Sequence, residues 1–181
     1  MGKRLIFLLG GARSGKSSYA EKWAQEYGKQ VLFVATAQAF DDEMRERIAA
    51  HRATRPAAWH TLEAPLQVGN GIQQVAIEYD TLVLDCVTLL ASNALLQLPE
   101  DCTQLQADEA VLSEVDSLIV TYKMSNATWL VISNEVGMGI VPPYRLGRLY
   151  RDALGRANQR IAQVADEVQL LVAGISWNLK R

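Results

Sequence analysis

A glycine-rich loop near the amino end constrains this chain more than any other segment. Residues 10–17 read Gly-Gly-Ala-Arg-Ser-Gly-Lys-Ser and match the pattern G-x-x-x-x-G-K-[ST] at every fixed position. The apolar run 5–9 precedes the loop and a helix-like segment follows it, which is the strand–loop–helix setting that this motif requires. Glycines let successive backbone N–H groups face phosphate oxygens, and the following helix adds positive potential. A glycine-rich turn that merely contains a lysine would not need this setting, so the sequence predicts a nucleoside triphosphate site.

Two residues of the loop have specific predicted roles, and an acidic residue farther along the chain would share the binding of the metal with one of them. Lys16 would neutralise the β- and γ-phosphates, and the Ser17 hydroxyl would hold Mg²⁺. An acid at the end of a buried strand should also serve the metal, and Asp85 follows the apolar run 81–84. The alternative role for Asp85 is to cap the next helix. The base-reading signatures of GTPase switch proteins are absent from the sequence, so they do not indicate which purine is bound.

Strands and helices alternate along the chain. Buried strands are expected at 31–36, 81–85, 128–133 and 168–173, with a weaker strand at 61–63. Helices are expected at 17–27, from 41 or 42 to about 55, at 66–78, 87–98 and 109–124, and from Pro142-Pro143 to about 165. This order predicts an α/β fold, with a mostly parallel sheet that binds ligands at the carboxyl ends of its strands. We expect residues 1–181 to form a single P-loop nucleotide-binding domain.

Composition excludes several classes of protein. The formal net charge of −2 argues against a nucleic-acid or anionic-membrane partner, because either would require a basic surface. Two cysteines and two histidines at unsuitable spacing indicate neither a disulfide framework nor a zinc site. The apolar run 5–9 is too short for the core of a signal peptide, so we expect a cytoplasmic protein with no membrane span.

A second loop, Asn134–Pro142, follows the predicted strand at 128–133 and should therefore lie at the carboxyl edge of the sheet. Its glycines would permit close approach of a ligand, and Glu135 could act on a substrate hydroxyl or on the metal. Alternatively, Glu135 simply faces water. The helix after this loop carries five arginines, which would form a solvated basic face, contact phosphates or contact another subunit; they are Arg145, Arg148, Arg151, Arg156 and Arg160.

The segment 41–55 contains a candidate nucleophile. Met44, Ile48, His51 and Arg55 are spaced four, three and four residues apart and so share one helix face. A histidine beside apolar positions is commonly a packed core residue. Neighbouring arginines support the alternative, that His51 attacks phosphorus. His51 lies about ten residues, roughly 15 Å, along its helix, so this helix would have to lie over the site and to act as a lid.

Several segments together resemble one enzyme family. These segments are the phosphate loop, Val34–Gln38, Asp42–Met44, Arg47-Ile48, His51, Arg55-Pro56, Trp59, Glu63, Asn134–Pro142, Arg151-Asp152, Gly155-Arg156, Asn158-Gln159 and Ala165–Val168. In these the chain resembles adenosylcobinamide kinase/adenosylcobinamide-phosphate guanylyltransferase, a bifunctional enzyme of cobalamin nucleotide-loop assembly. The likeness runs from about Leu8 to Gly174, and the Asn-Glu-Val-Gly-x-Gly-Ile-Val-Pro stretch is its most specific part.

The resemblance implies two reactions on one small-molecule substrate. The hydroxyl of adenosylcobinamide would be phosphorylated from ATP or GTP. GMP from GTP would then be transferred to that phosphate through a guanylyl-histidine intermediate, with release of pyrophosphate. The resemblance also implies a recombinase-like P-loop fold and a homotrimer.

The residues expected at the site follow from the motif and the resemblance. His51 and Lys16 would be catalytic, Ser17 and Asp85 would hold the metal, and Glu135 would belong to a substrate or catalytic loop. The expected nucleotide-binding residues are Gly10, Gly11, Ala12, Arg13, Ser14, Gly15, Lys16, Ser17, Ala35, Thr36, Ala37, Arg52, Ala53, Thr54, Arg55, Glu63 and Asp85. The chain has Ala50-His51 where some relatives have two histidines, and Asp85 where others have glutamate.

Two other classes of protein share parts of this pattern. A simple small-molecule P-loop kinase would use the loop and Asp85 but would have no need of His51. A recombinase-like motor would share the fold, but the acidic charge balance argues against it. Fold alone does not distinguish these classes, whereas the segments around His51 and Asn134–Pro142 do.

Overall fold

All strands of the computed structural model, which describes residues 2–39, 42–53 and 55–181, belong to one seven-stranded sheet. The order across the sheet is β3-β2-β4-β5-β1-β6-β7. The strands are β1 (Arg4–Gly10), β2 (Val31–Ala35), β3 (His60–Glu63), β4 (Thr81–Asp85), β5 (Thr128–Ile132), β6 (Glu167–Val172) and β7 (Ile175–Lys180). The first six pair in parallel, and β7 pairs antiparallel with β6. The predicted α/β fold with a mostly parallel sheet is confirmed.

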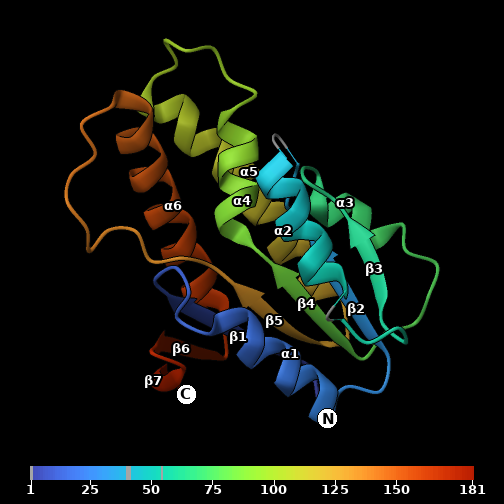
Figure 1. Cartoon of the computed structure of the whole chain (residues 1–181). Coiled ribbons are helices and arrows are strands. Elements are labelled where there is room, and N and C mark those ends of the chain that lie inside the picture. The colour runs from blue at the N-terminus through green and yellow to red at the C-terminus, as the bar shows by residue number, and fades with distance from the viewer. Residues whose placement is uncertain (1, 40–41, 54) are drawn as a thin grey trace.

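Helices cover both faces of the sheet (Figure 1). They are α1 (Lys16–Tyr27), α2 (Asp42–Ala53), α3 (Val68–Gln73), α4 (Val87–Leu95), α5 (Gln104–Met124) and α6 (Arg145–Val164). Successive side chains of β1 point to opposite faces, as strand geometry requires. Ile6 and Leu8 join a core with Ala20 and Ala24 of α1, whereas Leu5, Phe7 and their neighbours join the larger core under α3–α6. Burial on both faces explains why the central strands are continuous apolar runs.

The chain changes direction across the sheet at β1. From β1 it crosses to β2 on one side, and later it returns to place β6 on the other side. In open parallel sheets such a reversal leaves a crevice at the carboxyl ends of the strands, where ligands bind. The loop after β1 and the ends of β2 and β4 therefore meet at one edge of the sheet.

The predicted helix at 66–78 is much shorter in the structure. Only Val68–Gln73 is helical, and this segment contains Gly69 and Gly71, which lower helix stability. Beyond it, Val75, Ile77 and Tyr79 pack at alternate positions against the core, a spacing that suits an extended chain rather than a helix. The apolar residues after Gln73 therefore alternate as in an extended chain and do not follow the period of a helix.

Helix α5 begins earlier than the predicted start at 109. Thr103 is its N-cap: its side chain accepts a hydrogen bond from the Gln106 backbone, and its own N–H donates to the Gln106 side chain. This capping box turns the polar stretch after Pro99 into a helix start. The pattern Thr-x-x-Gln that makes it is visible in the sequence.

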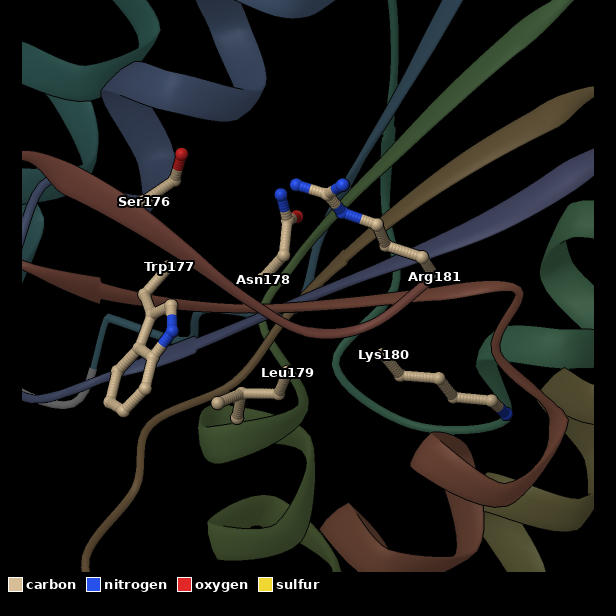
Figure 2. A pocket seen from close by; sticks show the side chains of 6 residues that line it. All are labelled: Ser176, Trp177, Asn178, Leu179, Lys180 and Arg181. Atoms are coloured by element: carbon tan, nitrogen blue, oxygen red, sulfur yellow. The ribbon is translucent and has the colours of Figure 1, made fainter.

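Strand β7 was not predicted. It follows a tight turn at Ala173 and Gly174, both of which have positive φ, and it forms the outer edge of the sheet. Figure 2 shows Trp177 and Leu179 projecting from one side of the strand, with Ser176 and Asn178 on the other. A hollow of about 510 Å³ runs along residues 176–181. Because every residue of β7 is exposed, the strand lacks the apolar run that identified the inner strands.

Candidate nucleotide site

The phosphate loop joins β1 to α1 and depends on two of its glycines. Gly10 has φ +151°, and a Cβ there would lie 2.4 Å from the Leu171 carbonyl oxygen. Gly15 has φ +97°, and a Cβ there would lie 3.1 Å from the Cα of Gly174. Both positions therefore combine an unusual backbone conformation with close neighbours from the β6–β7 hairpin. Gly15 is also the N-cap of α1, so the first turn of this helix presents its N–H groups beside the loop.

Lys16 is buried within the loop that contains it. Its side chain is 6% exposed, and its Nζ donates to the Gly11 carbonyl oxygen at 2.7 Å and to Ser14 Oγ at 3.3 Å. Burial lowers the pKa of Lys16, while the nearby Cys86 and Asp85 oppose this shift. The ammonium is thus a partly desolvated cation whose field is strong where phosphates would lie.

A cavity of about 440 Å³ opens beside this loop. Ten of the predicted site residues line it: Ala12, Arg13, Lys16, Ser17, Ala35, Ala37, Arg52, Arg55, Glu63 and Asp85. Six further lining residues were not among the predicted ones: Ala39, Cys86, Thr88, Leu89, Ile132 and Asn134. The cavity therefore joins the phosphate loop, the ends of β2, β3 and β4, and the region of Arg52 and Arg55.

Other predicted residues lie beside the cavity rather than among those that line it: Gly10, Gly11, Ser14, Gly15, Thr36 and Ala53. The first four belong to the phosphate loop, Thr36 follows β2, and Ala53 ends α2. Thr54 lies outside the described residues. His51 belongs to α2, but its side chain lies outside the described part of the chain.

Arg52 and Arg55 bring positive charge to the cavity from beyond the phosphate loop. Arg52 forms an ion pair with Glu63 at 3.1 Å, and the Arg55 guanidinium lies 3.7 Å from the centre of the Phe33 ring. Burial lowers the pKa of Arg55, and Asp85 is the largest opposing influence. A guanidinium that is stacked and partly desolvated is well placed to bind an anion.

Asp85 and Ser17 contribute oxygen atoms to the same cavity. Asp85 ends β4 and pairs in register with Ala35 on one side and Ile132 on the other. A carboxylate and a hydroxyl are ligands that suit Mg²⁺. Among the described residues, no group of three or more His, Cys, Asp or Glu side chains could hold a metal ion.

A buried polar network ties the ends of β2 and β4 together. Thr36 Oγ1 accepts from the Cys86 N–H at 2.8 Å and donates to the Cys86 carbonyl oxygen at 2.7 Å. Asn93 Nδ2 donates to the carbonyl oxygens of Thr36, at 2.8 Å, and Pro65, at 2.9 Å. A threonine after an apolar strand and an asparagine inside an apolar helix were the available sequence signals for this network.

The loop that follows β5 is joined to the phosphate loop through its backbone. Glu135 N–H donates to the Gly10 carbonyl oxygen at 3.1 Å, and Asn134 N–H donates to Thr88 Oγ1 at 2.7 Å. The Glu135 carboxylate accepts from the Gly137 N–H at 2.6 Å. Glu135 therefore stabilises the turn of its own loop, and Asn134 is the residue of this loop that lines the cavity.

The five arginines of α6 have partners within the chain. Arg145 and Arg148 donate to backbone carbonyls, including those of Cys102 and Pro143. The other three form ion pairs: Arg151 with Asp152, Arg156 with Asp108, and Arg160 with Asp116. The arginines that line the cavity are instead Arg13, Arg52 and Arg55. None of the five arginines of α6 lines the cavity, and their contact with phosphates or with another subunit stays a prediction.

A search of the described helices finds none with both the length and the apolar character needed to cross a membrane.

Comparison with solved structures shows the fold. The flagellar accessory protein FlaH of Methanocaldococcus jannaschii matches 99% of this chain and 79% of its own, with a TM-score of 0.54 and 12% identity. A prototypical ATPase from the type III secretion system of pathogenic bacteria matches 94% of this chain and 52% of its own, with a TM-score of 0.65 and 13% identity. At these identities the likeness extends to the fold alone.

Comparison with known sequences is more specific. The bifunctional adenosylcobalamin biosynthesis protein CobU of Salmonella typhimurium is 41% identical over 181 residues, covering 97% of this chain and 99% of that protein. The bifunctional adenosylcobalamin biosynthesis protein CobP of Pseudomonas aeruginosa is 42% identical over 174 residues, covering 96% and 95%. A family model described as cobinamide kinase / cobinamide phosphate guanyltransferase matches residues 6–179. The chain therefore belongs to the cobinamide kinase / cobinamide phosphate guanyltransferase family.

Proposed function

We propose that this chain is a bifunctional enzyme of cobalamin nucleotide-loop assembly. It phosphorylates adenosylcobinamide with ATP or GTP, and then transfers GMP from GTP to the phosphate just made. Membership of the cobinamide kinase / cobinamide phosphate guanyltransferase family is the observation that carries this proposal. The cavity that joins Lys16, Ser17 and Asp85 to Arg52 and Arg55 supports it, because both reactions require a bound triphosphate.

In the kinase step the acceptor hydroxyl oxygen attacks the γ-phosphorus, and the hydroxyl proton passes to water. The bond between the γ-phosphorus and the β–γ bridging oxygen breaks, and the nucleoside diphosphate leaves. Lys16 and the N–H groups of the phosphate loop orient the γ-phosphoryl group and balance charge on the leaving oxygen. This step needs no histidine nucleophile.

In the guanylyl step the phosphate loop would hold the triphosphate in the same way, but a different bond breaks. An imidazole nitrogen of His51 attacks the α-phosphorus of GTP, the bond to the α–β bridging oxygen breaks, and pyrophosphate leaves from the phosphate loop. An oxygen of the acceptor phosphate then attacks the phosphorus of the guanylyl-histidine, and the imidazole is released. Arg52 and Arg55, which line the cavity together with the phosphate loop, would bind the α-phosphate and balance its developing charge.

The residues of the nucleotide site follow from this proposal. The phosphate loop from Gly10 to Ser17 binds the triphosphate, the segment 35–37 borders it, and the segment 52–55 with Glu63 and Asp85 completes the GTP site. Glu135 has a supporting part, because its backbone and carboxylate shape the second loop.

Mg²⁺ fits the oxygen ligands of this cavity. Ser17 and Asp85 would hold it, since both residues line the cavity and a hydroxyl and a carboxylate suit this ion. When bound, Mg²⁺ neutralises charge on the phosphate oxygens and favours the leaving group.

We also propose that residues 1–181 form one P-loop domain, and that the enzyme is a cytoplasmic homotrimer that binds no nucleic acid. The single sheet and the family match over residues 6–179 support one domain. The exposed apolar side chains of Ile175, Trp177 and Leu179 on β7 offer a surface that a subunit contact would bury. The negative net charge supports small-molecule rather than nucleic-acid partners.

The test is to follow both reactions on one substrate. We expect the purified protein, given adenosylcobinamide, Mg²⁺ and ATP, to form adenosylcobinamide phosphate. Addition of GTP should convert this product to adenosylcobinamide-GDP and release pyrophosphate. A protein that makes only the phosphate, even with GTP present, would be a simple P-loop kinase and would contradict the second half of the proposal.

A further inference from the structure

The loop between β5 and α6 exposes an unusual amount of apolar surface. Five large apolar residues project from it and from the first turn of α6, and we call them the apolar loop surface. They are Met138 (82% exposed), Ile140 (96%), Val141 (58%), Tyr144 (79%) and Leu146 (52%). Scattered exposed apolar residues are ordinary, but five within nine consecutive positions of one segment, next to a residue that lines the cavity, indicate a binding surface.

Hydrogen bonds hold this loop at both ends. At its start, Glu135 N–H donates to the Gly10 carbonyl oxygen, and the Asn158 side chain donates to the Asn134 carbonyl oxygen at 3.0 Å. At its end, Arg148 donates to the carbonyl oxygens of Pro142, at 3.1 Å, and Pro143, at 2.7 Å. The apolar loop surface is therefore carried by a braced segment, and its base is bonded to the phosphate loop itself.

The position of the apolar loop surface indicates that it would contact the acceptor rather than the nucleotide. Asn134 lines the cavity, and the apolar side chains begin four residues later. Lys16 and three arginines also line the cavity, and these cations suit phosphates. The segment 136–144 contains no charged residue at all, so it does not suit a second anion.

The chemistry of the acceptor matches this surface. Cobinamide carries its reactive hydroxyl at the tip of a short arm, while its bulk is a broad corrin ring with methyl groups and uncharged amide side chains. When the hydroxyl reaches the γ-phosphate, the ring must rest outside the cavity. On the basis of the proposed function, we infer that the apolar loop surface binds the corrin ring of the acceptor and holds its arm toward the phosphate loop.

The test compares a double substitution in the apolar loop surface with a control substitution at an exposed methionine elsewhere in the chain. Met138 lies in the loop and Met124 (71% exposed) ends α5, at the opposite, amino edge of the parallel strands. The variant Met138→Ser/Ile140→Ser should raise the KM for adenosylcobinamide by about tenfold or more, since two apolar contacts are lost. The KM for ATP and the labelling of the protein by GTP alone should stay within about twofold of wild type. Met124→Ser should behave as wild type in every assay.

Equilibrium dialysis measures the binding of adenosylcobinamide without turnover, because the visible absorbance of the corrinoid reports its concentration. We expect the loop variant to bind the corrinoid about tenfold more weakly than wild type does. If the wild type phosphorylates and binds adenosylcobinamide but the loop variant does so equally well, this inference fails while the proposed function stands. If the loop variant changes oligomeric state by light scattering, the surface is a contact between copies of the chain and the inference is wrong. If the wild type neither binds nor phosphorylates the corrinoid, the proposed function itself fails.

Discussion

Lys16 is the side chain on which both proposed reactions depend. It is buried in the loop, and in each proposed reaction it would face the phosphates that leave or are transferred. Lys16→Ala should therefore reduce cobinamide phosphorylation and guanylylation together, each by about 100-fold or more. Parallel kinase and guanylylation assays would measure this effect. Lys22→Ala, on the exposed side of the same helix, is the control. A Lys16 variant that is still guanylylated at a normal rate would reveal a second nucleotide site.

Single residues were predictable where one local motif determines their position. Gly10, Gly15 and Lys16 belong to a continuous segment whose backbone conformation and function are linked, so the motif alone located them. Thr36 was expected at the site, but its hydrogen bond to Cys86 was not predicted, because the two residues are 50 positions apart in the chain. Asn93 was not identified at all, since the Thr36 carbonyl to which it donates is 57 positions away. The bond of the Glu135 carboxylate to its own loop was not predicted, and its action on a substrate hydroxyl or on the metal stays a prediction.

At the scale of elements, the start of α5 offers a direct test of the capping box. Thr103→Ala removes the side-chain acceptor for Gln106 N–H and leaves the exposed Gln106 side chain without its hydroxyl partner. The free energy of unfolding should fall by about 1 kcal/mol, as measured by urea denaturation. Kinase activity should be unchanged, because Thr103 does not line the cavity. An unaltered unfolding midpoint would show that the capping box contributes nothing to stability.

A second element-scale prediction concerns the contact between α5 and the start of β6. Tyr122 OH donates to Asp166 at 2.9 Å, and the same carboxylate oxygen accepts from Leu5 N–H at 2.7 Å. Tyr122→Phe should reduce the free energy of unfolding by about 1–2 kcal/mol at pH 7, because a hydrogen bond to a charged group is lost.

The pH dependence of this effect has a definite sign. Burial, followed by the bond to Asp166, raises the pKa of Tyr122 above the ordinary value of 10.0. The folded state therefore keeps a proton that the unfolded state loses above about pH 10. The stabilisation by the hydroxyl should be complete below that pH and should decline as the pH rises beyond it. A difference between Tyr122→Phe and wild type that grows above pH 10 would contradict this assignment.

Strands were predictable where burial on both faces of the sheet requires a continuous run of apolar residues. The run Thr81–Asp85 was predicted with its observed bounds, since an inner strand must be apolar throughout. Strand β7 was missed because an exposed edge strand carries no such run. The helix predicted at 66–78 is wrong except at Val68–Gln73. Two glycines lower the stability of the helix there, and the apolar residues that follow alternate as in an extended chain.

At the scale of the whole molecule, a mostly parallel sheet followed from the alternation of strands and helices, but the strand order did not. Which strand lies beside β1 depends on contacts between segments more than 100 residues apart, such as Leu5 opposite Trp129. The cavity could be predicted in its general location, at the carboxyl edge, but residues such as Thr88 and Leu89 enter it only through the folded arrangement of α4.

The proposed homotrimer is also a whole-molecule prediction. Light scattering at micromolar concentration should report a mass about three times that of one chain, as closed cyclic symmetry requires. Trp177→Ser should lower that mass if the exposed apolar face of β7 forms the subunit contact, whereas Met124→Ser should not. A wild-type protein that remains a monomer would contradict the assembly.

The central claim is that one cavity serves both a kinase and a guanylyltransferase that acts through His51. Mass spectrometry of the intact protein after incubation with GTP and Mg²⁺ tests it most directly. The account predicts a mass increase of one GMP per chain, in a bond that is labile to acid and stable to alkali, as a phosphoramidate should be. His51→Ala should lose the adduct and the transferase activity but keep substantial kinase activity, while His60→Ala should retain the adduct. An adduct of equal yield on His51→Ala would contradict the account and place the nucleophile elsewhere.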